Sequence, residues 1–458
     1  MIGLLKGRAA VPLLGDTMSE LARRYAVPGA QLAVYHDGDV SAVEFGELEH
    51  RGRRPVTRDT AFPIGSITKS FTATLAMVLV ADGDLELDAP LGDHVSDLDE
   101  ELSTRLTLRH LLSHTGGLVS DPDLDATPGV TPRRYLADHC HRGNLLLPPG
   151  TGFSYSNAGY VLAGHLIETV TGMSWWEAVE SILLRPLGIA PAFVGGGRYR
   201  RPGRPVATGH SVNAAAGRTR PVQQSLAPAE APTAALAVSA LDLVALGLMH
   251  VGDGMPDLLP AGTAAQLREP VPAAEPFGLA DGWGLGLALY RNGGTHWVGH
   301  DGNADGTACY LRVDPVGGWV VGFTSNANTG RALWKDVLAE LAAAGVPVER
   351  PTAWVPRGPS FAPPSDFAGT YANGDVGYVV AVRDGRPHIS VEGDPFVRLT
   401  VHADLTFSLR DPASGRQAPG GRFVRDPATG DVQALQVGGR LAVRRGHTRR
   451  DARRQRVA

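Results

Sequence analysis

The spacing of apolar residues predicts alternating helices and short strands over the first part of the chain. An amphipathic helix is expected at 16–25, followed by two alternating strands at 31–35 and 41–45, with Asp37-Gly38 as their hairpin turn. The later predicted elements are helices at 106–112, 159–170 and 175–184, strands at 283–290, 307–313 and 319–324, and a helix at 331–344. This order predicts an α/β (α+β) sandwich, in which helices cover a central antiparallel sheet and an inserted helical region holds the active cleft.

A second pattern begins after residue 346. The stretch 347–364 contains six prolines, a composition typical of a stiff linker between a domain at 1–346 and a second, smaller domain. Short alternating runs then recur at 378–382, 388–391, 396–401 and 435–443, separated by Asp-Gly, Gly-Asp and Gly-Gly turns. They predict a small antiparallel β-barrel at 365–445, lipocalin-like in outline, that is either a passive appendage or a lid on the cleft. The arginine-rich end, 446–458, is expected to be a disordered, solvated tail.

Charge, cysteine content and the lengths of apolar runs restrict the classes of partner and the compartment expected for this chain. A chain of 458 residues with net charge -4 can bury a sizeable core and gives no basis for binding nucleic acid. The two cysteines, Cys140 and Cys309, do not form a disulfide framework, which permits a reducing compartment. The first 16 residues lack the uninterrupted apolar run of a secretory leader, and we find no stretch of about 18 apolar residues. We therefore expect a cytoplasmic protein without a membrane partner.

The strongest chemical signal is Ser66 followed by Lys69 at the start of an apolar helical run. Residues three apart share one face of a helix, so the amine of Lys69 can reach the hydroxyl of Ser66 and take its proton during attack on an acyl carbon. The alternative is that Ser66 only caps a buried helix. Lysine usage argues against it, because the chain has three lysines among 43 basic residues and places one of them here.

Two other fragments carry suitable chemistry. Tyr155 and Asn157 lie in a turn-rich loop, where the phenol could relay a proton and the amide could fix Lys69 and a substrate amide. A strand-like stretch ends at His300, and the small neighbour Gly302 would let substrate approach the backbone. The N–H of Asn303 could then pair with that of Ser66 as an oxyanion hole. Taken alone, these fragments would be an aromatic anchor beside a turn asparagine and a histidine in a Gly-rich hairpin.

Histidines elsewhere do not suggest a metal. His139 and His141 flank Cys140 without a second pair of ligands at metal-binding spacing, so an exposed helix end is the favoured interpretation. His110 and His114 are four apart, but residue 111 is not the glutamate of a zinc-protease helix, and we interpret both as structural. No cofactor or metal is expected.

In this order and spacing the motifs resemble the serine DD-peptidase and class C β-lactamase superfamily over about residues 15–345. The segment 108–118, Leu-Arg-His-Leu-Leu-Ser-His-Thr-Gly-Gly-Leu, is similar to the stretch that this family carries between its first two motifs. The resemblance implies that Ser66 is the nucleophile, Lys69 and Tyr155 are the acid/base pair, and Asn157 is the amide of the second motif. His300 begins the third motif, where β-lactamases of this family usually carry Lys-Thr-Gly. The histidine form instead resembles the esterase and peptidyl-transfer branches.

The combination of this domain with a C-terminal barrel resembles the penicillin-binding-protein-type thioesterases, which are standalone cyclases of nonribosomal peptide assembly. The resemblance implies that Ser66 accepts a peptide from a carrier-bound thioester and that the peptide's own amine releases it head to tail as a macrolactam, in a cleft that excludes water and accepts D-residues. A cytoplasmic esterase or D-amino-acid peptidase is the alternative, with β-lactamase and an inactive binding module behind it. Arg444, in the last barrel strand, is either an anchor for a substrate carbonyl or carboxylate or a plain surface arginine.

Overall fold

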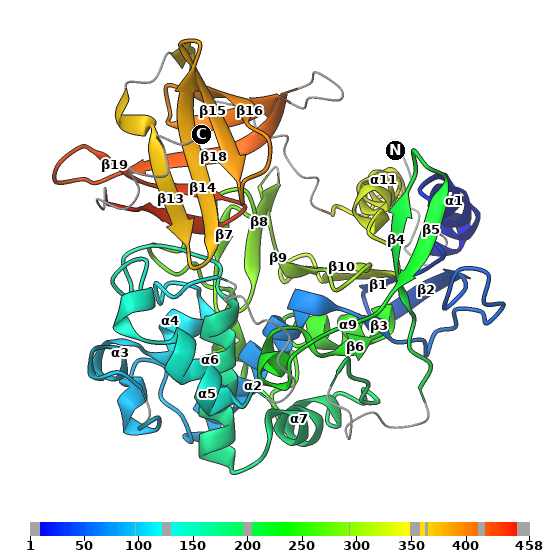
Figure 1. The fold of residues 1–458 in the computed structure, drawn as a ribbon. Helices are drawn as coiled ribbons and strands as arrows, with labels where there is room; N and C mark the ends of the chain where they lie inside the picture. Colours follow the sequence, from blue (N-terminus) through cyan, green and yellow to red (C-terminus); the bar gives the residue numbers. More distant parts are fainter. Residues whose placement is uncertain are drawn as a thin grey trace.

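Both ends of the first domain contribute to one antiparallel sheet in the computed structural model (Figure 1), which describes residues 10–96, 98–120, 130–195, 204–292, 294–348, 358–361, 365–410 and 417–446. Its strand order is β2-β1-β11-β10-β9-β8-β7. The strands are β1 Gly29–His36, β2 Asp39–Gly46, β7 Gly282–Trp283, β8 Ala288–Asn292, β9 Thr295–Gly302, β10 Ala308–Asp314 and β11 Trp319–Ser325. The N-terminal β1–β2 hairpin thus pairs with β11, so the sheet is completed by contacts between segments far apart in the sequence.

Within the catalytic domain, the structure divides the predicted strand 283–290. It forms β7 and β8, because residues between them turn onto the buried helix α2 (Thr68–Asp82). There the Ser70 hydroxyl donates to the carbonyl of Gly286 at 2.8 Å, and the N–H of Gly286 donates to Leu112. Apolar alternation alone could not reveal this turn, since its residues are buried like those of a strand.

Helices cover both faces of the sheet. α1 (Ala10–Arg24) and α11 (Gly330–Ala343) lie together on one face (Figure 1), where Trp334 of α11 stacks on Tyr310 with ring centroids 4.9 Å apart. α9 (Ala240–Leu248) packs on the other face against β1 and β11. The class of fold predicted from the sequence is confirmed.

The remaining helices form the inserted region around α2, whose side chains are almost all buried. They are α3 Glu100–Arg105, α4 Leu108–Leu112, α5 Pro132–His139, α6 Asn157–Thr171, α7 Trp175–Ala178, α8 Ala231–Ala234 and α10 Ala261–Arg268. Short 3-10 turns occur at Gly65–Ile67, Leu91–Asp93, Arg142–Asn144, Pro228–Glu230 and Ser365–Phe367, and a π-helical turn, Val179–Leu184, continues α7. Two small pairs complete the domain: β3 Phe62–Pro63 with β6 Ala237–Val238, and β4 Gly209–Asn213 with β5 Arg218–Val222. No helix in the described ranges has the length and apolar character needed to cross a bilayer.

The C-terminal strands close into an antiparallel barrel, as predicted. Its strands are β13 Gly369–Asn373, β14 Val376–Arg383, β15 Arg386–Val391, β16 Val397–His402, β17 Thr406–Arg410, β18 Gln417–Arg425, β19 Val432–Val437 and β20 Arg440–Arg444. Closure comes from the β13–β20 and β16–β17 pairings, around a core that includes Phe367, Phe407 and Phe423. The predicted run 435–443 is a hairpin, since Gly438 and Gly439 turn the chain between β19 and β20.

The barrel rests on the catalytic domain through that hairpin. Tyr155 donates its backbone N–H to Gly439 at 3.0 Å, and Gly439 donates its own to Phe277 at 2.9 Å. Near the C-terminal end of the predicted linker, 347–364, the short strand β12 (Ser360–Phe361) pairs with β16 of the barrel. The tail from 447 onward lies outside the described residues.

Candidate active site

Ser66 and Lys69 lie together where the 3-10 turn Gly65–Ile67 runs into α2. The Lys69 amine is 3.2 Å from the Ser66 hydroxyl oxygen and also donates to the carbonyl of Thr233 at 3.0 Å. Lys69 is fully buried, whereas Ser66 is partly exposed. Ser66 does not occupy the N-cap position of the turn or of α2, and the residues that do make no side-chain cap hydrogen bond. The serine is therefore placed for reaction rather than for capping.

The second motif closes over the same amine. The Tyr155 ring centroid lies 5.2 Å from the Lys69 nitrogen, and the ring of Tyr160 lies 5.7 Å from it. Asn157 is the first residue of α6, and its backbone N–H donates to Ser120 at 2.8 Å. Ser156 caps this helix and donates its hydroxyl to Val119 at 2.6 Å, so the loop that presents the phenol is tied to the segment ending at Ser120.

The third motif lies at the end of β9. His300 is buried, with its ring centroid 6.2 Å from that of Tyr155. Its Nδ1 is 2.6 Å from the carbonyl of Asp301, and since a carbonyl only accepts, Nδ1 carries the proton. Burial, and next the charge of Lys69, lower the pKa of His300 to about 4. The ring is neutral at pH 7, and its Nε2 is a buried acceptor that bonds to no protein group in the described part of the chain.

Close backbone contact joins the first and third motifs. Gly65 has φ +51°, and a Cβ built on it would lie 1.9 Å from the carbonyl oxygen of Asn303. A Cβ on Gly302 would lie 1.9 Å from the carbonyl of Ile64. These contacts bring Asn303 beside Ser66. The pairing of their backbone N–H groups as an oxyanion hole stays a prediction.

The far side of the same strand holds an ion pair. Asp301, next to His300 but directed to the other face, accepts from Arg312 at 2.6 Å. Arg312 is 3 % exposed and its guanidinium carbon lies 4.1 Å from the ring centroid of Tyr290. The ion pair holds the end of β9 in place from the face of the sheet opposite to His300.

Three neighbours of the site were missed from the sequence. Thr233 contributes only a backbone carbonyl, which no motif reveals. His114, interpreted as structural, lies with its ring centroid 4.2 Å from that of Tyr155; its Nδ1 accepts from the N–H of Ser156, and burial holds its pKa well below the ordinary value. Arg440, in the turn-proximal part of β20, places its guanidinium carbon 5.3 Å from the Tyr155 ring centroid. The tertiary fold alone brings Arg440 here.

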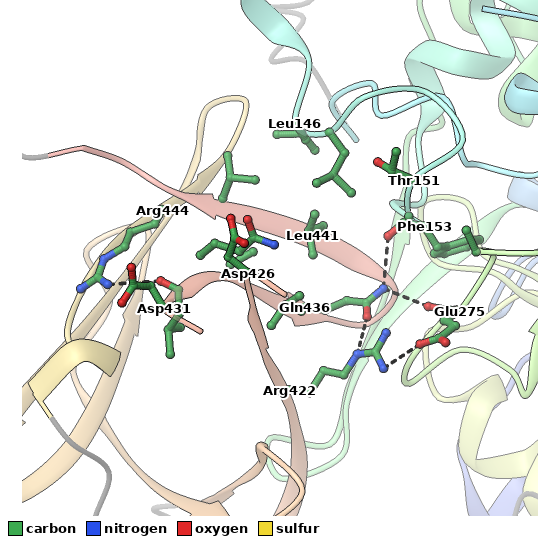
Figure 2. Close-up of a pocket in the computed structure, with 18 of the residues that line it drawn as sticks. Leu146, Thr151, Phe153, Glu275, Arg422, Asp426, Asp431, Gln436, Leu441 and Arg444 are labelled. Carbon is green, nitrogen blue, oxygen red and sulfur yellow. Dashed lines mark hydrogen bonds and ion pairs between the residues drawn. The ribbon is translucent and has the colours of Figure 1, made fainter. Parts of the chain in front are cut away.

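Arg444, which the sequence suggested as an anchor, lies farther along β20. It donates to the carbonyls of Val432 and Ala368, within the barrel. It also lines a cavity of about 820 Å³ on the outer face of β18–β20. Figure 2 shows this cavity beside the loop that carries Leu146, Thr151 and Phe153. Within the described residues, Ser66, Lys69, Tyr155 and His300 do not line it, so it is distinct from the site around the serine.

The other candidates from the sequence have structural environments. His110 completes a capping box with Thr107 at the start of α4. Cys140 is buried, which raises the pKa of its thiol to about 12. The described ranges contain no group of three or more histidine, cysteine or acidic residues that could hold a metal ion.

A partly exposed serine, a buried lysine at hydrogen-bond distance and a tyrosine over the amine are groups that acyl transfer through a serine requires. The family model described as Beta-lactamase matches residues 14–344, and the chain belongs to this family. It is 34% identical to "Penicillin-binding protein 4" of Amycolatopsis lactamdurans over 78% of this chain and 96% of that protein.

Solved structures extend the similarity through the barrel. The chain superposes on the crystal structure of SurE with a TM-score of 0.87 and 42% identity, covering 95% of this chain and 99% of that one. For the structure of SurE with D-Leu, the TM-score is 0.84 at 41% identity, covering 95% and 100%. The resemblance to the penicillin-binding-protein-type thioesterases of this superfamily is confirmed, and the chain is a serine hydrolase or acyltransferase of the penicillin-binding-protein and β-lactamase superfamily.

Proposed function

We propose that the protein is a peptide cyclase that takes a nonribosomal peptidyl thioester onto Ser66 and releases it by head-to-tail macrolactam formation. The observation that carries this proposal is the similarity to SurE along nearly the whole chain, catalytic domain and barrel together. The D-Leu in the related SurE structure supports a substrate with a D-residue at the acyl end. A carrier protein would present the thioester inside the cell, so we place the enzyme in the cytoplasm.

The geometry suits the first half of the reaction. The Ser66 oxygen attacks the thioester carbonyl while its proton passes to the Lys69 amine, which lies 3.2 Å away. The N–H groups of Ser66 and Asn303 stabilise the oxyanion. The pantetheine sulfur leaves with a proton relayed through Tyr155, and the peptide remains as an ester of Ser66. One C–S bond breaks and one C–O bond forms.

The second half requires an amine instead of water. The peptide's own α-amine attacks the ester, a C–N bond replaces the C–O bond, and the proton lost by the amine returns to the Ser66 oxygen through Tyr155 and Lys69. The Nε2 of the neutral His300 is an acceptor to which an N–H of the attacking peptide amine can donate. The aromatic surroundings favour aminolysis by excluding water, since the buried rings of His114 and Trp283 contact Tyr155 and the buried ring of Phe153 packs against both of them.

Hydrolysis to a linear product is the second candidate. Its support is the 28% identity over 330 residues to "Unguisins hydrolase ungD'" of Aspergillus campestris, of which the match covers 61%. The same acyl-serine would form, and water would replace the amine. The two proposals therefore differ only in the last nucleophile.

A linear peptidyl N-acetylcysteamine thioester with a D-residue at its acyl end distinguishes them. Cyclisation gives a product lighter than the free acid by one water, as measured by mass spectrometry, whereas exclusive linear acid would replace the proposal with hydrolysis. Ser66→Ala is the control, because products that persist in this variant do not arise from the enzyme. The epimer with an L-residue at the acyl end, run in parallel, tests the stereochemical part of the proposal.

A further inference from the structure

One barrel residue, Asn373, is buried against the loop of the second motif. It ends β13 and is 3 % exposed. Its Oδ1 accepts from the backbone N–H of Ser120 at 2.8 Å. Its Nδ2 lies 2.7 Å from the carbonyl of Leu441, 2.9 Å from the Ser120 hydroxyl and 3.4 Å from the Ser154 hydroxyl. A single side chain therefore joins the barrel to two segments of the catalytic domain.

Each partner of this amide is either hydrogen-bonded to a residue of the site or adjacent to one in the sequence. The carbonyl of Ser120 accepts from the N–H of Asn157 at 2.8 Å. Ser154 precedes Tyr155, and its hydroxyl also accepts from the N–H of Leu441 at 3.2 Å. Leu441 in turn follows Arg440, whose guanidinium lies over the Tyr155 ring.

We propose that Asn373 is a positioning residue for the acyl-serine site, and that through it the docked barrel holds Tyr155, Asn157 and Arg440 in their reactive arrangement. This inference rests on the acyl-serine chemistry proposed above, but not on the nucleophile that ends the cycle. Asn373 touches none of the reacting groups. It acts by setting the distance between the segment ending at Ser120 and the loop that presents Tyr155.

The amide is chemically specific at this position. An N–H group faces Oδ1 and a carbonyl faces Nδ2, so the side chain must accept on one side and donate on the other. A buried amide that lost either partner would leave polar groups unsatisfied in a site that water does not reach. Aspartate keeps the acceptor, but when ionised it presents an oxygen to the Leu441 carbonyl. When protonated, it can donate again.

The test compares Asn373→Ala with Ser390→Ala. Ser390 is likewise buried in the barrel, and its hydroxyl donates to the carbonyl of Asp394, another barrel residue, at 2.6 Å. Both variants remove a buried barrel hydrogen-bonding group, so circular dichroism and melting temperature report any general damage. The measured quantity is the rate constant for acylation of Ser66 by a fluorophosphonate probe, followed by intact-protein mass spectrometry, together with kcat and KM for the N-acetylcysteamine thioester.

A positioning role predicts that Asn373→Ala slows acylation by roughly 10²-fold, mainly in kcat, while Ser390→Ala stays within about threefold of the wild type. Acylation of Asn373→Ala at the Ser390→Ala rate would overturn the inference. Absence of wild-type labelling would instead overturn the proposed function itself.

Asn373→Asp provides a second test, in which the readout is the pH dependence of the acylation rate. A purely structural role for Asn373 would not change this dependence. Its acylation rate, taken as a ratio to the wild type at each pH, should rise as the pH falls and the introduced carboxyl gains the proton that restores the donor. This ratio also decides the matter if Asn373→Ala is recovered unfolded. A ratio near one that does not change with pH would contradict the inference.

Discussion

Arg440 of the barrel lies over the ring of Tyr155 in the catalytic domain, with its guanidinium carbon 5.3 Å from the ring centroid. The two residues are far apart in sequence and meet because the β19–β20 hairpin donates and accepts backbone hydrogen bonds beside the second motif. Since we propose that Tyr155 relays protons, a cation over its ring gives the barrel a direct part in the site.

Arg440→Ala should therefore lower kcat/KM for the thioester by about 10- to 100-fold, because the cation over the Tyr155 ring is lost. The matched control is Arg383→Ala. Arg383 lies over Phe396 at 3.6 Å, elsewhere in the barrel, so it tests loss of a cation–π pair without the site. Equal kinetics for the two variants would contradict the prediction. Arg444→Ala, measured alongside, tests the role suggested by the sequence: reduced kcat/KM at an unchanged melting temperature would support it.

Lys69→Met should abolish turnover while preserving the fold. The methionine fills most of the space of the buried lysine but cannot take the Ser66 proton, and loss of a general base reduces rates by about 10²- to 10⁴-fold. Ser66→Ala should remove probe labelling altogether and change the free energy of unfolding by less than about 1 kcal/mol, since the hydroxyl caps nothing. Near-normal kcat in Lys69→Met would exclude Lys69 as the base.

The sequence was informative where the chemistry is local. Ser66 and Lys69 occupy one turn, so their meeting follows from helix geometry, and helix and strand periods predict α6, α11 and most of the central sheet. The barrel was equally predictable, because regular turns separate its short alternating strands.

The features that could not be predicted depend on contacts distant in the chain. Thr233 acts through a carbonyl, which every residue has, and Arg440 and Asn373 are ordinary barrel residues until the hairpin docks on Tyr155. The break between β7 and β8 is of the same kind, because a buried turn has the apolar content of a strand. Pattern reasoning assigns elements, but it does not place one domain's side chains in another domain's site.

Buried histidines should make the protein less stable in weak acid. Burial lowers the pKa of His250 and of His300 to about 4, against an ordinary value of 6.5. Between pH 6.5 and pH 4, these two histidines are protonated in the unfolded chain but neutral in the folded chain. Stability is therefore complete above about pH 6.5 and falls toward pH 4, by up to roughly 1.4 kcal/mol per pH unit for each group.

Urea unfolding at several pH values between 7 and 4 measures this. His250, placed between α9 and α10 and outside the catalytic machinery, is the better residue to change. His250→Gln should flatten the acid limb and leave kcat at pH 7 unaltered. An unchanged pH dependence of the free energy of unfolding would show that His250 is not one of the responsible groups.

Gly65 should be far more sensitive to substitution than Gly83, although both have positive φ and flank the same helix. Gly83 has no neighbouring atom within 4 Å of an added Cβ, so Gly83→Ala should cost only the backbone strain of about 1 kcal/mol and leave acylation intact. In Gly65→Ala the new Cβ meets the Asn303 carbonyl oxygen at 1.9 Å, so strain is joined by a displacement of the strand end. Because that displacement separates the two N–H groups that we propose as oxyanion donors, acylation should fall by about 10²-fold or more. Comparable acylation by both variants, measured at matched stability, would mean that Asn303 does not take part in the oxyanion site.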